Sequence, residues 1–204
     1  MAEMWWSEAT LQPGSRLAAG GPHRLHQAVE TATGRAGRGG GEARTLWRLE
    51  RNVLLVQAQV VADWDRAGAR VVSSRVRRVD DAWDGIVDGD DLAFACFVNP
   101  TVAMHTGMPG VRGVRVPINP KDHGALDGWW AAQGVALGFD PQETSVAFSR
   151  TLEVRKPGRS FAIVGVELVG TLRVVDSEQF RRGLRRGVGR ERAFGCGLML
   201  IRRA

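Results

Sequence analysis

The chain has 204 residues and holds 28 lysines and arginines against 22 aspartates and glutamates, which gives a net charge of +6. A hydrophobic share of 44% is ordinary for a globular protein and allows a buried core. No uninterrupted apolar stretch approaches the roughly 18 residues of a membrane span, so no membrane partner is expected. The length suits two compact domains of roughly 100 residues each.

Nearly all of the positive charge is arginine, because Lys121 and Lys156 are the only lysines. Arginine donates in a planar fork that matches phosphate, and it stacks on bases. A high-GC genome would also favour arginine codons, and this alternative would explain much of the bias. The excess is nevertheless concentrated at 150–159 and 181–203, which favours an acidic polymer as partner.

Cysteine usage and the first residues indicate the compartment. Cys96 and Cys196 lie in apolar runs without CxxC spacing, which predicts buried thiols and a reducing compartment. The opening stretch "MAEMWWSEATL" has acids where a signal peptide needs a basic region. We therefore expect a cytoplasmic protein.

The first half of the chain follows the order β-α-β-β-(α)-β, in which the second helix is poorly marked. Its helix is predicted from Leu25, Ala28, Val29 and Ala32 at helical spacing, with Pro22 in the first turn. The predicted segments are a strand at 4–11, a helix at 20–32, strands at 45–60 and 69–79, a loop or short helix at 80–91 and a strand at 92–102.

The second half repeats the order β-α-β-β-α-β more clearly. Its predicted segments are a strand at 111–118, a helix at 127–139, two strands over 144–175, a helix at 177–189 with Ser177 or Asp176 as N-cap, and a strand at 194–203. This order is the ferredoxin-like plan. The sequence thus predicts an α+β protein of two tandem ferredoxin-like domains, at 1–105 and 110–204, with a boundary near 103–111.

The glycine-rich stretch "GVGRERAFGCGLML", residues 187–200, joins the last predicted helix to the last predicted strand. A nucleotide cofactor needs glycines between a strand and the following helix. The reversed order argues against that use, so no cofactor is expected. Glycine amides can approach a nucleic-acid backbone closely, although the glycines could equally serve tight turns only. The candidate RNA-binding residues here are Gly187, Gly189, Gly195 and Gly197 with the flanking Arg185, Arg186, Arg190 and Arg192.

Several segments, in this order and at similar separations, resemble the CRISPR-associated CasE (Cse3) type of endoribonuclease. They are "HRLHQAVE", "FACFVNPTVA" followed by "RGVRVPI", "VELVGTLRV" and the closing "RGVGRERAFGCGLMLI". The resemblance covers nearly the full length and implies a tandem ferredoxin-like fold. It implies cleavage of the long CRISPR transcript within each repeat hairpin. It also implies that the product stays bound as the protein becomes a subunit of the type I-E Cascade complex, with other Cascade subunits as partners.

Four histidines are present: His23, His26, His105 and His123. His26 matches the family's catalytic position in "HRLHQ", and His23 stands where the family often has an aromatic hydroxyl. Metal-independent RNA cleavage needs a base for the 2′ proton, an acid for the 5′ oxygen and cations for the phosphate. His26 could be the base with His23 as acid or phosphate binder, or His23 could be a bystander.

The turn "RKPGR" places Arg155, Lys156 and Arg159 at the tip of a predicted hairpin. By resemblance, a basic hairpin here enters the groove of the RNA stem, and three cations on a ribbon suit the phosphates of an A-form helix. An ordinary solvated turn is the alternative. Arg150 and Arg173 are further candidates for contact with RNA.

The acidic residues Asp80, Asp81, Asp88, Asp90 and Asp91 could suggest a two-metal nuclease. They lie in a glycine-punctuated segment without a histidine nearby, which favours a solvated loop, and no metal site is predicted. Three functions stay open. The chain is an endoribonuclease acting on CRISPR repeat RNA, an RNA-binding Cascade subunit that has lost cleavage, or a ferredoxin-like protein with a basic surface and no RNA partner.

Overall fold

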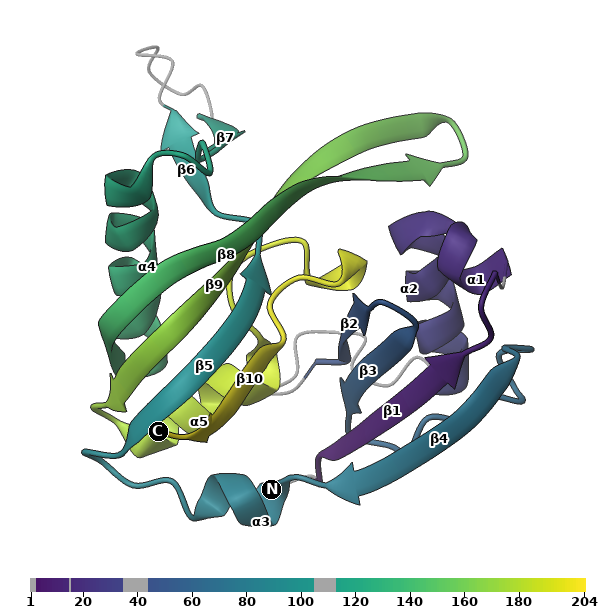
Figure 1. Ribbon diagram of the computed structural model, residues 1–204, viewed down its shortest axis with the longest axis horizontal. Helices are drawn as coiled ribbons and strands as arrows, with labels where there is room; N and C mark the ends of the chain where they lie inside the picture. Colours follow the sequence, from purple (N-terminus) through teal and green to yellow (C-terminus); the bar gives the residue numbers. More distant parts are fainter. Residues whose placement is uncertain (1–2, 15, 35–43, 105–112) are drawn as a thin grey trace.

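The computed structural model describes residues 3–14, 16–34, 44–104 and 113–204. The chain forms two four-stranded antiparallel sheets that lie next to each other (Figure 1). Their strand orders are β2-β3-β1-β4 and β10-β5-β9-β8. In each sheet the strands that come first and third along the chain are the central pair, which is the ferredoxin-like arrangement. The predicted α+β fold of two tandem ferredoxin-like domains is confirmed.

The first sheet is covered by one long helix. Its elements are β1 (Trp5–Leu11), α1 (Arg16–Ala19), α2 (Gly21–Ala32), β2 (Leu46–Glu50), β3 (Val53–Ala58) and β4 (Val71–Arg78). The predicted stripe on α2 packs inward, because Leu25, Val29 and Ala32 are buried in one cluster with Leu54 and Trp47. Between β3 and β4 the chain makes turns rather than the second helix of the fold.

The second sheet follows the helical linker α3 (Asp80–Asp84). Asp176 caps α5, because its side chain accepts a hydrogen bond from Gln179 N. The core holds Trp130, Phe139 and Phe180. No helix in the described ranges is long and apolar enough to cross a membrane. The elements are β5 (Asp91–Val98), β6 (Thr101–Met104), β7 (Val114–Pro117), α4 (His123–Leu137), β8 (Phe139–Lys156), β9 (Arg159–Val174), α5 (Ser177–Arg186), the 3₁₀ turn η1 (Arg192–Phe194) and β10 (Met199–Arg203).

The single strand predicted at 45–60 is wrong, because the segment is the β2–β3 hairpin. Leu46 pairs with Gln57 and Glu50 with Val53. The turn is closed by Arg51, whose φ of 54° lies in the left-handed region. Neither turn residue is a glycine, so the usual signal of a tight hairpin was missing.

The strand predicted at 92–102 in the first domain is mostly β5, which belongs to the second sheet instead, and its last residues begin β6, which pairs with β7. β5 pairs with β9 and with β10, and β4 closes the first sheet beside β1. The hairpin at 45–60 supplies the extra strand of the first sheet, so the main sheet of each domain still has four strands, with β6 and β7 forming a separate two-stranded ribbon. We therefore propose a domain division between Arg78 and Asp91 rather than near 103–111, most of which lies outside the described residues.

Candidate functional site

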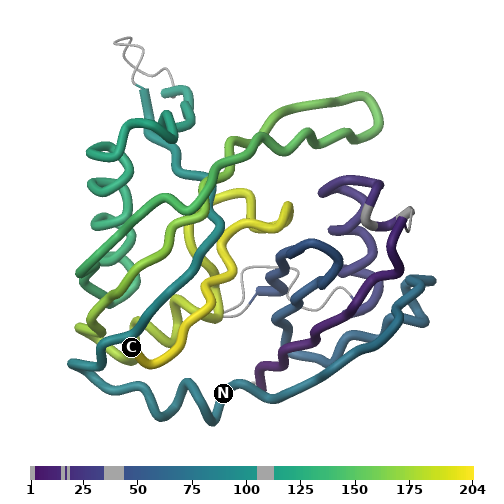
Figure 2. The backbone as a smooth tube through the Cα atoms, viewed as in Figure 1, coloured from purple at the N-terminus to yellow at the C-terminus, as the bar shows by residue number. Residues whose placement is uncertain are grey.

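Three segments that are far apart in the sequence lie against one another. They are α2 itself, the tip of the long β8–β9 hairpin and η1 in the glycine-rich segment (Figures 1 and 2). The hairpin arches over toward α2, and a Cβ placed on Gly21 would lie 3.8 Å from the Glu153 carbonyl oxygen. The first domain and the C-terminal segments therefore build one site.

His26 lies at the centre of this meeting point. Its side chain is 25% exposed, so it is anchored but reachable. The imidazole packs edge-on against Phe194, with ring centroids 6.0 Å apart and an interplanar angle of 61°. Nε2 lies 3.5 Å from Glu30 Oε1, one helical turn further along α2. The ring and the carboxylate together hold the imidazole in one orientation.

The hairpin tip supplies cations around the same aromatic residues. Lys156 Nζ lies 4.8 Å from the centroid of Phe194, and Arg159 Cζ lies 5.2 Å from that of Phe161. The two rings pack edge to face at 5.6 Å. A hollow of about 730 Å³ opens beside the tip. Two of the predicted cations thus lie in the cluster with His26, whereas Arg155 points to Glu153 in an exposed ion pair.

His23 lies one turn before His26 on α2 and is partly buried. Its Nδ1 is buried, and among the described residues it has no hydrogen-bond partner. His123 begins α4 in the other domain, and His105 lies outside the described residues. The sequence reasoning missed Phe194, although this residue is the one aromatic side chain in the glycine-rich stretch.

The glycines at 187–197 serve the packing of the two domains. A Cβ on Gly195 would lie 2.9 Å from the Trp47 ring, and one on Gly187 would lie 2.7 Å from Leu46. Trp47 Nε1 also donates to Ala193 O. The amides of Gly187 and Gly197 already donate to backbone carbonyls. Gly187, Gly195 and Gly197 are buried and Gly189 is partly exposed, so contact of these glycines with RNA stays a prediction.

Arg185 differs from the other arginines of this segment. It is buried, and its Nη2 donates to Asp80 Oδ1 at 2.9 Å. Its guanidinium also lies 5.8 Å from the Trp83 ring centroid. The side chain is therefore occupied in joining α5 to the linker, and its contact with RNA is not supported. Arg186 and Arg190 are exposed, and Arg192 is partly exposed.

The acidic segment is structural. Arg173 binds Asp91 through two hydrogen bonds of 2.9 Å, and this pairing lowers the pKa of the Asp91 carboxyl. Arg150 stacks on Phe97, with its Cζ 4.8 Å from the ring centroid. No group of three metal-ligating side chains occurs within the described ranges. The remaining aspartates accept hydrogen bonds from Met4 N (Asp80), Arg78 (Asp81), Ser177 N (Asp88) and Val87 N (Asp90).

Residues 4–203 match the model of a protein family described as CRISPR associated protein. The chain belongs to this family. A curated relative is the CRISPR-associated endoribonuclease Cse3 of Thermus thermophilus, with 28% identity over 97% of this chain and 99% of that protein.

Solved structures agree with the family assignment. The structure of Thermus thermophilus Cse3 bound to an RNA that represents a pre-cleavage complex matches this CRISPR-associated chain with a TM-score of 0.78 and 28% identity. The match covers 98% of this chain and 99% of that one. Cas6e from Escherichia coli shares the fold, with a TM-score of 0.69 and 17% identity over 98% of this chain and all of that one.

Proposed function

We propose that this protein is a metal-independent endoribonuclease that cleaves CRISPR precursor RNA within the repeat hairpin. The observation that carries the proposal is the contact of His26 with Phe194, with Lys156 over the same ring. The relative Cse3 is named as an endoribonuclease and has been solved with RNA before cleavage, which supports the substrate class. The product stays bound, and the protein then serves as a subunit of Cascade.

The chemistry uses the RNA's own 2′ hydroxyl. His26 takes the 2′ proton, and the freed oxygen attacks the adjacent phosphorus, which displaces the 5′ oxygen of the next nucleotide. Lys156 and Arg159 lie where they can balance the charge that builds on the phosphate. The products are a 2′,3′-cyclic (or 3′) phosphate and a 5′ hydroxyl. Because the nucleophile comes from the substrate, no cofactor enters the reaction.

His23 is the candidate acid for the leaving 5′ oxygen. It shares a face of α2 with His26 because the two are three residues apart. Its Nδ1 is buried, so a proton given to the RNA would come from the other ring nitrogen, Nε2.

The test is cleavage of a labelled CRISPR repeat hairpin from the source genome in the presence of EDTA. We expect cutting at the 3′ base of the stem to persist, and a kinase to label the new 5′ hydroxyl directly. His26→Ala should reduce the single-turnover rate by at least about a thousandfold, because proton transfer is lost. Its hairpin affinity should stay close to that of the unchanged protein.

His123→Ala is the matched control, since this histidine is exposed on another helix. It should cleave at the normal rate. Loss of all cutting in EDTA, or full activity of His26→Ala, would show the mechanism to be wrong. Tight binding without any cleavage by the unchanged protein would instead favour an RNA-binding subunit that has lost catalysis.

A further inference from the structure

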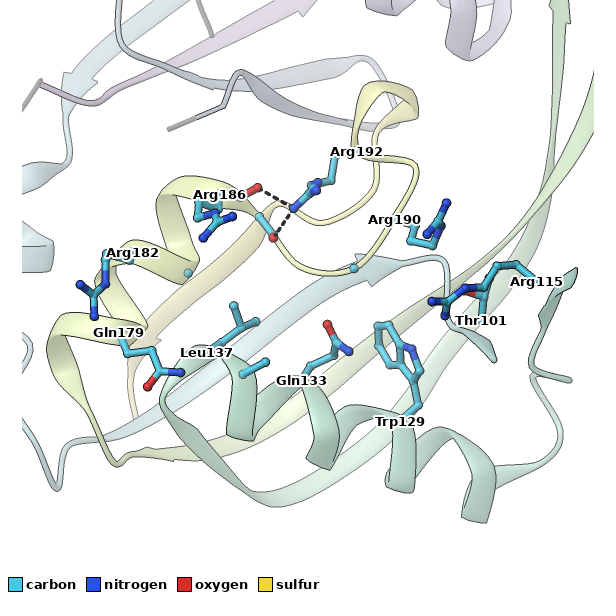
Figure 3. A pocket seen from close by; sticks show the side chains of 14 residues that line it. Thr101, Arg115, Trp129, Gln133, Leu137, Gln179, Arg182, Arg186, Arg190 and Arg192 are labelled. Atoms are coloured by element: carbon cyan, nitrogen blue, oxygen red, sulfur yellow. Dashed lines mark hydrogen bonds between the residues drawn. The ribbon is translucent and has the colours of Figure 1, made fainter. Parts of the chain in front are cut away.

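A second concave site, which His26 does not line, lies beside the glycine-rich segment. It is a pocket of about 660 Å³ between α4, α5, the ribbon β6–β7 and the glycine-rich segment (Figure 3). Its lining residues include no aspartate or glutamate. Five guanidinium groups surround it, those of Arg115, Arg182, Arg186, Arg190 and Arg192.

Most of this charge is not neutralised by the protein. Within the described part of the chain, Arg115, Arg186 and Arg190 form no ion pair. Arg182 meets Glu178 in an exposed pair that is worth little in water. Partial burial and then the charges of neighbouring arginines lower the pKa of Arg192. Like charges gathered without a counter-charge favour the binding of an anion with several charges.

One arginine is held in place by the fold. Arg192 Nη1 donates to the carbonyl oxygens of Arg186 and Gly187, both at 3.1 Å. These carbonyls belong to the C-terminal end of α5, where helical oxygens lack partners within the helix. The guanidinium is thus fixed at the rim of the pocket, and little side-chain entropy remains to be lost on binding a ligand.

The pocket also offers an aromatic face and an amide. Trp129 and Gln133 rise from α4 toward the glycine-rich segment (Figure 3). Trp129 is partly exposed, and its ring is so close to Gly189 that a Cβ there would lie 3.2 Å away. An aromatic ring among cations suits an unpaired base next to its phosphate. A duplex would offer phosphates only, and an acidic peptide would leave the ring unused.

The position of the pocket identifies which RNA would reach it. Arg192 lines the pocket and begins η1, and Phe194 ends η1 against His26. The RNA strand that leaves the base of the hairpin beside His26 therefore has only a short path to the arginines that line the pocket. We propose that this pocket binds the single-stranded RNA that flanks the repeat hairpin. This inference rests on the proposed function, because it presupposes a hairpin held at His26.

The test measures the affinity gained from an unpaired flank. Hairpins with about eight extra nucleotides on the 5′ side, on the 3′ side or on neither side cover the usual footprint of a single-strand site. A 2′-deoxy nucleotide at the cleavage point keeps them intact. We expect one flank to improve the affinity of the unchanged protein by about tenfold, with a steeper salt dependence. The variant Arg115→Ala/Arg182→Ala should lose this gain, yet bind and cleave the bare hairpin normally.

The control variant Arg75→Ala/Arg202→Ala removes the same charge from exposed strand positions outside the pocket and should keep the gain. Three results would overturn the inference: an equal flank effect in both variants, an equal loss on bare and flanked hairpins, or a loss only of assembly with an acidic protein partner. A failure of the unchanged protein to bind and cleave the bare hairpin would instead refute the proposed function.

Discussion

Phe194 is the residue on which the arrangement of the candidate site depends. Its ring touches His26, Phe161 and Lys156, and it is 6% exposed. Phe194→Leu keeps an apolar side chain but removes the flat surface. Because small misplacements of reacting groups cost large factors in rate, we expect single-turnover cleavage to fall by about a hundredfold. Hairpin affinity should change by less than about threefold.

Phe148→Leu is the control for this variant, because Phe148 is an exposed aromatic residue outside the His26 cluster. It should cleave at the normal rate. A merely structural function of Phe194 would lower the melting temperature and leave the rate per folded molecule unchanged, which would contradict the positioning function.

The two cysteines give a prediction about thiol reactivity. Cys96 and Cys196 are fully buried, and burial raises the pKa of the Cys196 thiol to about 12 and that of Cys96 well above its ordinary value. The reactive thiolate is therefore scarce at pH 8. We expect a chromogenic disulfide reagent to label the folded protein only over hours, and two thiols per chain at once in guanidinium. Rapid labelling of the folded protein would disprove this burial.

At the scale of elements, the β8–β9 hairpin is the most exposed basic feature of the His26 site. Arg155→Ala/Arg159→Ala removes two cations from its tip without touching a core residue, so the melting temperature should not change. The slope of log affinity against log salt should fall by about one for each RNA phosphate that the tip no longer neutralises. Hairpin binding measured at several salt concentrations checks this, and an unchanged slope would show that the tip does not meet RNA.

The same scale shows where sequence reasoning succeeds and fails. The helix α2 and the long hairpin were predictable because their apolar period and the Pro157-Gly158 turn act locally. The β2–β3 turn at Arg51 was not, since a non-glycine residue adopts the left-handed conformation there. The sequence also could not show which sheet β5 joins, because a buried apolar strand fits either sheet until its partners are known.

The candidate site divides along the same line. Motif resemblance named His26 and Lys156 as candidates, and the structure places both side chains beside Phe194. The position of Arg185 beside the glycine-rich stretch also made it a candidate RNA ligand, and only the structure shows that it is buried and paired with Asp80 where α5 meets the linker. The pocket lined by Arg115 and Trp129 could not be predicted from the sequence either, because its walls come from separate elements that meet only in the fold.

At the scale of the whole molecule, the two sheets are joined by buried polar contacts. Gln57 is 1% exposed, and its side chain donates to the Leu184 carbonyl at 2.8 Å. Arg48 of the first sheet binds Glu167 of the second at 3.1 Å. Burial raises the pKa of the Glu167 carboxyl, and the neighbouring Arg48 opposes that rise. Such partners satisfy each other only when the domains are correctly docked, so the seam between the domains fixes their relative position.

Gly195 tests whether close packing across this seam governs both stability and catalysis. Gly195 and Gly89 have similar φ values, 86° and 90°, but a Cβ would meet the Trp47 ring at 2.9 Å on Gly195 and nothing within 4 Å on Gly89. Substitution by alanine should cost both variants about 1–2 kcal/mol for the left-handed backbone. Gly195→Ala should lose about 1–3 kcal/mol more through overpacking, as measured by urea unfolding. Because Gly195 follows Phe194 directly, its variant should also cleave more slowly, whereas Gly89→Ala should not. Equal losses of stability in the two variants would mean that the Trp47 ring moves aside without cost. The glycines of this segment would then be required only for their backbone conformation.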